Sequence, residues 1–378
     1  MDHPIKSIFQ IHLSKSWIFI LGLVLGLGIL SGKAFSQDTI RTYYDEESLL
    51  IKEVFTKFNG KAQGQVKLFD LNGKLVLIGN LRDDKRHGLF YDLDPDTGDT
   101  LRIVNFENNL RQGLTQSFYP DGQISQESYF VDNQLEGPVT SYYEDGTVRD
   151  RSLFKKNKPD GLTESFYPNG KVKSRISFSN GQYDGKIEDY DEEGNLLSST
   201  TYSKGILHGP DLQYFSNGKI RSQRTFNQGE LDGEYLLLFE NGHPERKGFY
   251  KKGLPEGEMV EYFPDGTEKM KAVYSKGVPV QPTLYFYEDG TLKSRITYDS
   301  NGRKIREENF YPSGKPFSTV PFQNGAEQGQ VKILYENGTP KEIRNYKAGR
   351  LDGKQEWYAE DGSLIRSETY ENGIIVKK

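Results

Sequence analysis

Short runs of alternating apolar and polar residues, separated by glycine-containing turns, fill most of this chain. Residues 161–185 show the pattern as GLTESFYPNGKVKSRISFSNGQYDG. The run from Lys171 to Phe178 alternates strictly, which is typical of a half-buried strand. The triplet Pro168-Asn169-Gly170 just before it indicates a tight turn, because glycine reaches positive φ at little cost. Strand, turn and strand together predict a β-hairpin.

This hairpin recurs every 24 residues. One glycine begins the first strand, a second lies in the turn, and an aromatic residue stands near the end of the second strand. The first glycine is found at Gly113, Gly137, Gly161, Gly185, Gly209, Gly233, Gly257, Gly329 and Gly353. The aromatic residue is found at Phe130, Phe154, Phe178, Tyr202, Phe226, Tyr250, Tyr274, Tyr298, Phe322, Tyr346 and Tyr370. A fixed period at independent positions predicts a tandem array.

The repeat pattern is incomplete at the N-terminal end of the array and again within residues 278–320. Residues 64–378 carry the repeat, whereas residues 37–63 fit only half of the template, so we expect a degenerate capping repeat there, as terminal units are often atypical. In residues 278–320, Gln281 and Ile305 replace the first glycine and prolines accumulate. Proline removes a hydrogen-bond donor from a sheet. A kink or an irregular joint is therefore predicted at 278–320.

The expected fold is all-β: an elongated, solenoid-like, single-layer sheet of about 13 tandem antiparallel hairpins. An isolated hairpin is marginally stable in water, so each unit must gain order from its neighbours. No stretch after residue 36 shows apolar residues at helical spacing, and glycine recurs too often for helices. Two strands per unit advance the array by about 10 Å.

Composition agrees with a thin sheet and excludes several classes of function. Hydrophobic residues make up 34% of the chain, yet it has 24 Tyr and 22 Phe, which is unlike a disordered protein. The formal net charge of -5 argues against nucleic-acid binding. With no cysteine, the chain has no disulfide, no thiol nucleophile and no thiolate metal site.

The first 36 residues resemble a secretory signal. Lys6 and Lys15 precede an uncharged, largely apolar run from Trp17 to Leu30, and the small-x-small triplet Ala34-Phe35-Ser36 follows. This is the order of a signal peptide, and a run of 14 residues is short for a membrane-spanning helix. We predict cleavage after Ser36 and export to the periplasm, the cell surface or the medium. An uncleaved N-terminal membrane anchor is the alternative.

The repeat resembles the MORN repeat, and more closely the bacterial MORN-variant repeat. The resemblance rests on aromatic-x-x-Gly-x-x-x-Gly, an aromatic pair and a turn with Asp or Asn before glycine. Residues 250–266 are one clean copy, and residues 226–242 are another. The further Gly-x-Gly of conventional MORN arrays is missing. Similar bacterial chains are known as YwqK-type antitoxins, which implies neutralisation of a partner protein.

Residues capable of catalysis or metal binding have simpler interpretations here. The carboxylates Asp121, Asp145, Asp265, Asp289 and Asp361 precede turn glycines, where Asp favours the turn by bonding nearby backbone. His87, His208 and His243 show no ligand spacing and are expected in surface loops, with a metal ligand as the alternative for His208. The sequence therefore predicts no enzyme, no cofactor and no metal site.

The aromatic pairs before the turns are the candidate binding surface. Neighbouring residues of a strand point to opposite faces, so one ring of each pair should pack in the stack and the other should face outward. The candidate outward rings, for contact with a protein partner, are Tyr119, Tyr143, Tyr167, Phe215, Phe263, Tyr287 and Tyr311. The alternative is that both rings only stabilise the array.

The function expected from these observations is that of an exported, non-enzymatic scaffold. It would bind another protein through its extended β surface, and the family resemblance implies binding in the manner of an antitoxin or immunity protein. A cell-envelope module that binds glycans or lipid headgroups is the alternative. Nucleic acid is not expected as a partner, and a membrane only through an uncleaved signal segment.

Overall fold

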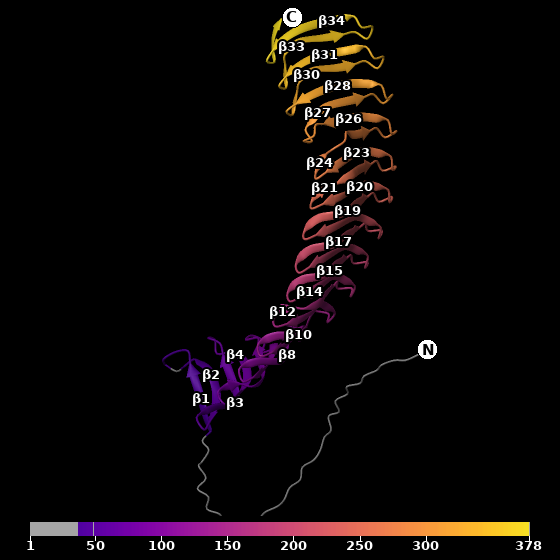
Figure 1. Cartoon of the computed structure of the whole chain (residues 1–378). Helices are drawn as coiled ribbons and strands as arrows, with labels where there is room; N and C mark the ends of the chain where they lie inside the picture. Colours follow the sequence, from indigo (N-terminus) through magenta and orange to yellow (C-terminus); the bar gives the residue numbers. More distant parts are fainter. Residues whose placement is uncertain (1–36, 48, 378) are drawn as a thin grey trace, which may run out of the picture.

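The computed structural model describes residues 37–47 and 49–377. In this part of the chain there is no helix, and hence none able to cross a membrane, while 35 strands form one antiparallel sheet. The hairpins follow one another along a curved ribbon (Figure 1). The predicted all-β array of tandem hairpins is confirmed, and the predicted signal peptide at 1–36 lies outside the described residues.

The strands fall into long members, which cross the ribbon, and short pieces, which continue a long member beyond a break at the first glycine of a unit. The long strands are β1 (Gln37–Tyr43), β2 (Ile51–Phe58), β3 (Lys61–Phe69), β4 (Leu75–Arg82), β6 (Gly88–Leu93), β7 (Thr100–Glu107), β8 (Leu110–Phe118), β9 (Ile124–Val131), β10 (Gln134–Tyr142), β11 (Val148–Lys155), β13 (Gly161–Phe166), β14 (Val172–Ser179), β15 (Gln182–Tyr190), β16 (Leu196–Ser203), β17 (Ile206–Tyr214), β18 (Ile220–Asn227), β19 (Glu230–Leu238), β20 (Pro244–Lys251), β22 (Gly257–Tyr262), β23 (Glu268–Ser275), β25 (Thr283–Phe286), β26 (Leu292–Tyr298), β27 (Lys304–Phe310), β28 (Pro316–Gln323), β30 (Gly329–Leu334), β31 (Pro340–Lys347), β33 (Gly353–Tyr358), β34 (Leu364–Glu371) and β35 (Ile374–Lys377). The short pieces are β5 (Lys85–Arg86), β12 (Lys158–Pro159), β21 (Leu254–Pro255), β24 (Val278–Pro279), β29 (Ala326–Glu327) and β32 (Arg350–Leu351).

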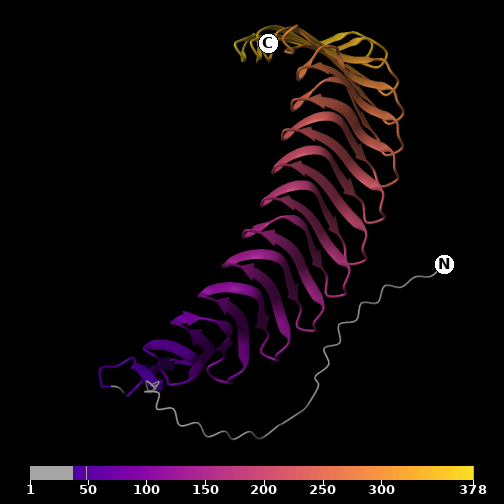
Figure 2. The same cartoon turned by 60° about the horizontal axis from the view of Figure 1, so that its bottom comes forward.

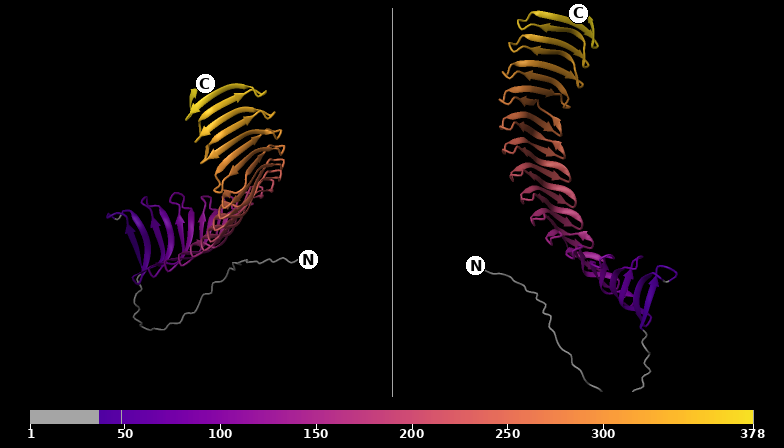
Figure 3. Two further views of the ribbon diagram at one scale, coloured as in Figure 1. Left: turned by 45° about the horizontal axis from the view of Figure 1, so that its top comes forward. Right: turned by 180° about the vertical axis from the view of Figure 1, so that it is seen from behind.

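Each long strand pairs with the next long strand of the chain, so the sheet is a meander. In a typical stretch, Ser165 of β13 lies opposite Ser174 of β14, and Ser174 lies opposite Asp189 of β15. The ribbon twists as it advances, so that strands near the two termini run in different directions (Figures 2 and 3). This is the twist that L-amino acids impose on any sheet.

Two kinds of turn alternate at the two edges of the ribbon. At the long-turn edge, residues 167–171 close a loop in which the amide of Tyr167 donates to the carbonyl of Lys171 at 2.8 Å. At the short-turn edge, Asn180 and Gly181 join β14 to β15 with φ of 50° and 83°. Two successive positive φ values define the hairpin turn that matches strand twist and favours Asn-Gly.

Backbone bonds at the short-turn edge tie each hairpin to the preceding one. The amide of Gly181 donates to the carbonyl of Pro159 at 2.8 Å, and the amide of Gly205 donates to the carbonyl of Tyr183 at 2.7 Å. Each acceptor lies in the preceding unit. The turn amide would otherwise be left to solvent, so this bond couples hairpin formation to stacking.

The two faces of the sheet differ in crowding. One face, here the crowded face, carries a row of five buried side chains, Val66, Phe90, Val104, Thr115 and Ser128, which lie on β3, β6, β7, β8 and β9. The opposite face, here the open face, carries exposed Leu, Tyr and Phe side chains. Most of the buried side chains therefore lie on one face, and this face is the core of the ribbon.

The stretch 278–320 is an irregular joint, as predicted. The turn after β26 is a long one, in which the amide of Asp299 donates to the carbonyl of Arg303 at 2.8 Å, where other hairpins have a two-residue turn. Strands β25 to β28 nevertheless remain paired in order, so the sheet continues through the joint. At the other end, residues 37–43 and 51–58 form a hairpin that β3 extends.

Candidate functional site

The candidate rings stand where the first strand of each hairpin enters the long turn. We call the set Tyr119, Tyr143, Tyr167, Phe215, Phe263, Tyr287 and Tyr311 the ring file. All seven rings are half-buried and lie on long turns at one edge of the ribbon, and the turns that begin at Asp191 and Phe239 fall between members of the set. The structure therefore brings the predicted residues into one line, about 10 Å apart where consecutive units both contribute.

The tyrosines of the ring file form hydrogen bonds between neighbouring hairpins of the array. Each hydroxyl donates to a backbone carbonyl of the next hairpin, at 2.6–2.9 Å. The acceptors are Tyr142, Phe166, Tyr190, Phe310 and Leu334. Burial, and next the charge of Glu192, raise the pKa of Tyr167, so its hydroxyl keeps the donated proton at neutral pH. The ring file has a structural role, and its contact with a partner stays a prediction.

Two further tyrosines make the same bond and were not singled out from the sequence. The hydroxyl of Tyr335 donates to the carbonyl of Tyr358, and that of Tyr44 donates to the carbonyl of Phe69, each at 2.9 Å. The 24-residue phase already places Tyr335 in the file. Where the aromatic residue is replaced by aspartate, at Asp70 and Asp191, the carboxylate accepts amides of its own turn instead.

Basic side chains lie over several rings of the file. Lys173, Arg221 and Lys293 stand 5.8, 6.0 and 5.4 Å from the ring centres of Tyr167, Phe215 and Tyr287. Such pairs are attractive, since a cation is drawn to the face of an aromatic ring. Their charged groups nevertheless remain available to solvent, because each lies at the edge of the ribbon.

A hollow of about 450 Å³ opens between two consecutive members of the file, Phe263 and Tyr287. Glu288, Asp289 and Lys293 are among the other residues that line it. The hollow thus combines aromatic walls with charges of both signs. An inserted side chain could contact a ring on each side and a carboxylate.

The aspartates before the turn glycines have the predicted turn chemistry. Each carboxylate of Asp121, Asp145, Asp265, Asp289 and Asp361 accepts the amide two residues on, at 2.8–3.0 Å. The side chain and then the amide of Thr147 lower the pKa of Asp145. The long-turn edge is therefore acidic, with exposed Glu144, Asp145, Glu192, Glu193, Glu240, Asp265, Glu288, Asp289, Glu336, Glu360 and Asp361.

The short-turn edge carries charges of both signs, with exposed carboxylates at Asp83, Asp84, Glu107, Asp132, Asp184, Glu230 and Glu371. Exposed lysines there are Lys155, Lys156, Lys158, Lys204, Lys251, Lys252, Lys276 and Lys347. Lys156 and Lys252 adopt φ of 50° and 51°, a region that non-glycine residues enter at a cost. The long-turn edge is thus the more acidic of the two edges.

Other polar residues are accounted for within the fold. His208 is exposed in β17, and the ring of His243 contacts the carbonyl of Pro264 at 3.1 Å. Burial alone raises the pKa of Asp150, but bonds from Ser165, Ser141 and Arg149 outweigh burial and lower it. Over residues 37–47 and 49–377, no cluster of His, Asp and Glu has the arrangement of a metal site.

A family model described as "MORN repeat variant" matches the chain eight times. The matched segments are residues 111–132, 135–156, 159–180, 207–228, 231–252, 282–300, 327–348 and 351–372. Hairpins that fall between the matches, such as β15 with β16, keep the same pairing and the same register shift before the turn. The repeat therefore extends through the gaps between matches.

Similar solved structures include the crystal structures of TcdB2-TccC3-TEV and TcdB2-TccC3-Cdc42. The identities are 12% and 11%, over 88% and 90% of this chain. The TM-scores of 0.16 and 0.13 are too low to carry an argument, and this chain covers 20% and 26% of those chains. The repeat pattern, the hairpin array and the eight family matches agree with one another, and the chain belongs to the MORN repeat variant family, whose repeats form a scaffold for binding.

Proposed function

We propose that this protein is an exported, non-enzymatic scaffold that binds another protein along the ring file. The hollow between Phe263 and Tyr287 is the observation that carries the proposal. It has aromatic walls, and Tyr and Phe are enriched where proteins meet. Neighbouring long turns offer similar rings at a regular spacing, so an extended partner could engage several of them at once.

The charge of the long-turn edge favours a partner with basic side chains. Glu288 and Asp289 line the hollow, and further carboxylates such as Asp265 and Glu240 continue along the edge. Opposite charges accelerate encounter and fix register more than they add affinity. The partner expected here is therefore an extended protein segment with Lys or Arg between apolar residues.

A site-specific photocrosslinker tests this proposal without knowledge of the partner. The full chain, tagged at its C-terminus and expressed in its source cells, carries the crosslinker at position 263, at position 287 or at Gln228 of the short-turn edge. We expect one protein adduct of the same mass at 263 and 287 and none at Gln228, which is exposed on the opposite edge.

Two outcomes would contradict the proposal. Equal adducts at all three positions would show that the ring file is not selective. Retention of the protein by polysaccharide or lipid vesicles, with no protein adduct at 263 or 287, would favour the glycan or lipid alternative. Export is tested separately, by N-terminal sequencing of protein from the envelope or medium, with a start near Gln37 expected.

A further inference from the structure

An apolar stripe crosses five strands of the open face, near the short-turn edge. Its members, one on each of β8, β9, β10, β11 and β13, are Leu114, Tyr129, Pro138, Leu153 and Leu162. Leu114 lies opposite Tyr129, and Pro138 lies opposite Leu153. The four residues other than proline are 45–48% exposed. Contiguous exposed apolar surface of this kind usually marks a contact with another molecule.

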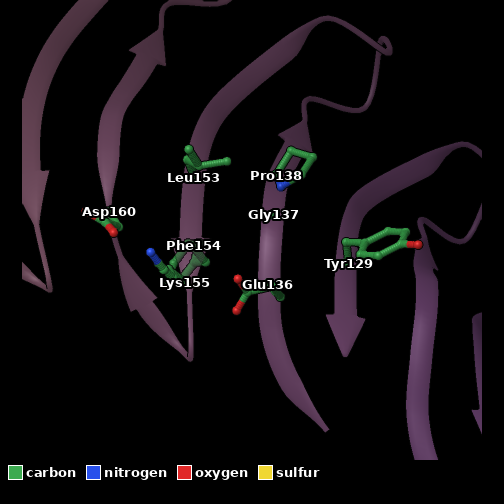
Figure 4. A pocket seen from close by; sticks show the side chains of 8 residues that line it. All are labelled: Tyr129, Glu136, Gly137, Pro138, Leu153, Phe154, Lys155 and Asp160. Carbon is green, nitrogen blue, oxygen red and sulfur yellow. The ribbon is translucent and has the colours of Figure 1, made fainter. Parts of the chain in front are cut away.

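The centre of the stripe is hollowed. Tyr129, Gly137, Pro138 and Leu153 line a cavity of about 770 Å³ (Figure 4), and a Cβ atom at Gly137 would stand 3.7 Å from the Cβ atom of Tyr129. The residues of the cavity that carry charge, Glu136, Lys155 and Asp160, lie toward the edge. The stripe is therefore an apolar surface with a central hollow, into which side chains of a partner can pack.

A row of polar residues runs beside the stripe on the same face and the same strands. In strand order it consists of Gln116, Glu127, Thr140, Arg151 and Glu164. Glu127 accepts hydrogen bonds from Gln116 and Tyr142, at 2.9 Å each, and among residues 37–47 and 49–377 no cation lies in salt-bridge range of it. Arg151 lies 5.9 Å from the ring of Phe166, and within the described part of the chain no carboxylate pairs with it.

Stripe and row share one symmetry about β10. Reversal of the strand order about β10 exchanges Leu114 with Leu162 and Tyr129 with Leu153, and Pro138 keeps its place. The same reversal exchanges Glu127 with Arg151, so residues of opposite charge change places, while the neutral Thr140 stays at the centre. A surface with this property is complementary to itself about a twofold axis parallel to β10.

We propose that a second copy of this chain docks face to face on the apolar stripe, about a twofold axis parallel to β10. In this dimer, Glu127 of one copy faces Arg151 of the other, twice. Rotation about an axis along the strands keeps the strands of the two sheets aligned, which is the usual arrangement of two sheets packed about 10 Å apart. The inference does not depend on the ring file, which lies at the other edge.

The contact is small and predicts weak association. Five strands span about 24 Å, and six residues of each strand span about 20 Å. The footprint is then about 500 Å² per copy, so about 1,000 Å² is buried in total, which is the lower limit for a specific interface. We therefore expect a reversible dimer with a dissociation constant in the micromolar range.

Sedimentation of the full chain tests the interface. Between about 1 and 200 μM, a range that suits an interface of this size, the wild type should pass from monomer to dimer. Leu153→Glu should raise the dissociation constant by about 100-fold, because two carboxylates per dimer become buried without a partner. Lys332→Glu is a matched control, since Lys332 is exposed on the same face outside the stripe and should not change association. A wild type that stays monomeric, or an unaffected L153E, would overturn the proposal.

Charge exchange tests the twofold axis itself. E127R and R151E should each lose self-association, because equal charges then face each other twice. A mixture of the two variants should form a heterodimer, because the arginine introduced at 127 faces the glutamate introduced at 151 and the native pair faces across the other contact. Circular dichroism confirms that each variant is folded. Failure of the mixture to associate, with both variants folded, would refute the axis.

Discussion

Removal of one hydroxyl from the ring file gives a sharp measure of what holds the hairpins together. In Tyr143→Phe, the ring stays in place and only the bond to the carbonyl of Phe166, at 2.8 Å, is lost. A net hydrogen bond contributes about 0.5–1.5 kcal/mol to stability. Tyr143 is half-buried, so we expect a loss of about 1 kcal/mol in the free energy of unfolding.

The effect should accumulate over consecutive hairpins. Tyr119 and Tyr167 make the same bond one unit before and one unit after Tyr143. These bonds lie about 10 Å apart, and changes at that distance with no shared partner usually add. The triple variant Y119F/Y143F/Y167F should therefore lose about 3 kcal/mol.

The natural phenylalanines of the file allow the opposite change. Phe263 lacks the hydroxyl, and the equivalent acceptor would be the carbonyl of Phe286, a residue that also lines the neighbouring hollow. Phe263→Tyr should stabilise the array by about 1 kcal/mol if the hydroxyl finds this carbonyl.

Urea unfolding followed by circular dichroism measures both changes, with midpoint and slope fitted for each variant. The reasoning is refuted if Tyr143→Phe leaves the midpoint unchanged and Phe263→Tyr fails to raise it. In that case stability would not explain why tyrosine stands at these positions, and contact with a partner would become the leading explanation.

Three further predictions concern the turns and the core. The pKa of Asp145, Asp265, Asp289 and Asp361 is lowered by turn donors, so stability should be constant above about pH 4 and fall as pH drops below it, because these carboxyl groups are protonated in the unfolded chain before they are protonated in the folded one; urea midpoints between pH 7 and 3 should show the decline, and D145N/D265N should make it shallower. Gly79→Ala should lose about 1–3 kcal/mol, because a methyl group there would stand 2.3 Å from the ring of Phe90; the double variant with Phe90→Leu should lose less than the sum of the two single losses. Lys156→Asn should gain up to about 1 kcal/mol in thermal or urea unfolding, because asparagine tolerates the φ of 50° better than lysine; an unchanged midpoint would show that the lysine causes no strain.

The sequence was sufficient for the array and for the irregular joint. The alternation in Lys171–Phe178 and the glycine at each turn are local signals, and the 24-residue phase repeats them often enough to exclude chance. The joint followed from Gln281 and Ile305, because each stands where glycine otherwise begins a unit. These features depend on a few neighbouring residues, so one sequence carries them.

The environment of the rings could not be predicted in the same way. Neighbouring ring residues were expected to divide between packing and solvent, yet Tyr142 donates to Glu127 on the open face while Tyr143 donates to the next hairpin. The acceptor of Tyr143 lies 23 residues further on. Its position depends on the register shift between Ser141 and Tyr142, which period-two alternation does not encode.

The apolar stripe was missed for a related reason. The stripe combines two positions of the repeat: Leu114, Pro138 and Leu162 follow the first glycine, and Tyr129 and Leu153 lie near the end of the second strand. They become neighbours only through the cross-strand registers of β8 to β13. Each of these positions is polar in other units, as at Lys186 and Thr201, so the repeat phase alone does not single out the stripe.

One unit of this protein is two strands, and that even number fixes how its length can change. Duplication or loss of a whole unit returns the chain to the same edge, so carboxylates such as Asp145 and lysines such as Lys156 keep to their opposite margins in a longer or shorter relative. Gain of a single strand would move every later long turn, with its carboxylates, to the opposite edge of the ribbon. Recombination between units can thus change the length of the ribbon in steps of about 10 Å, while each edge keeps its own charged residues.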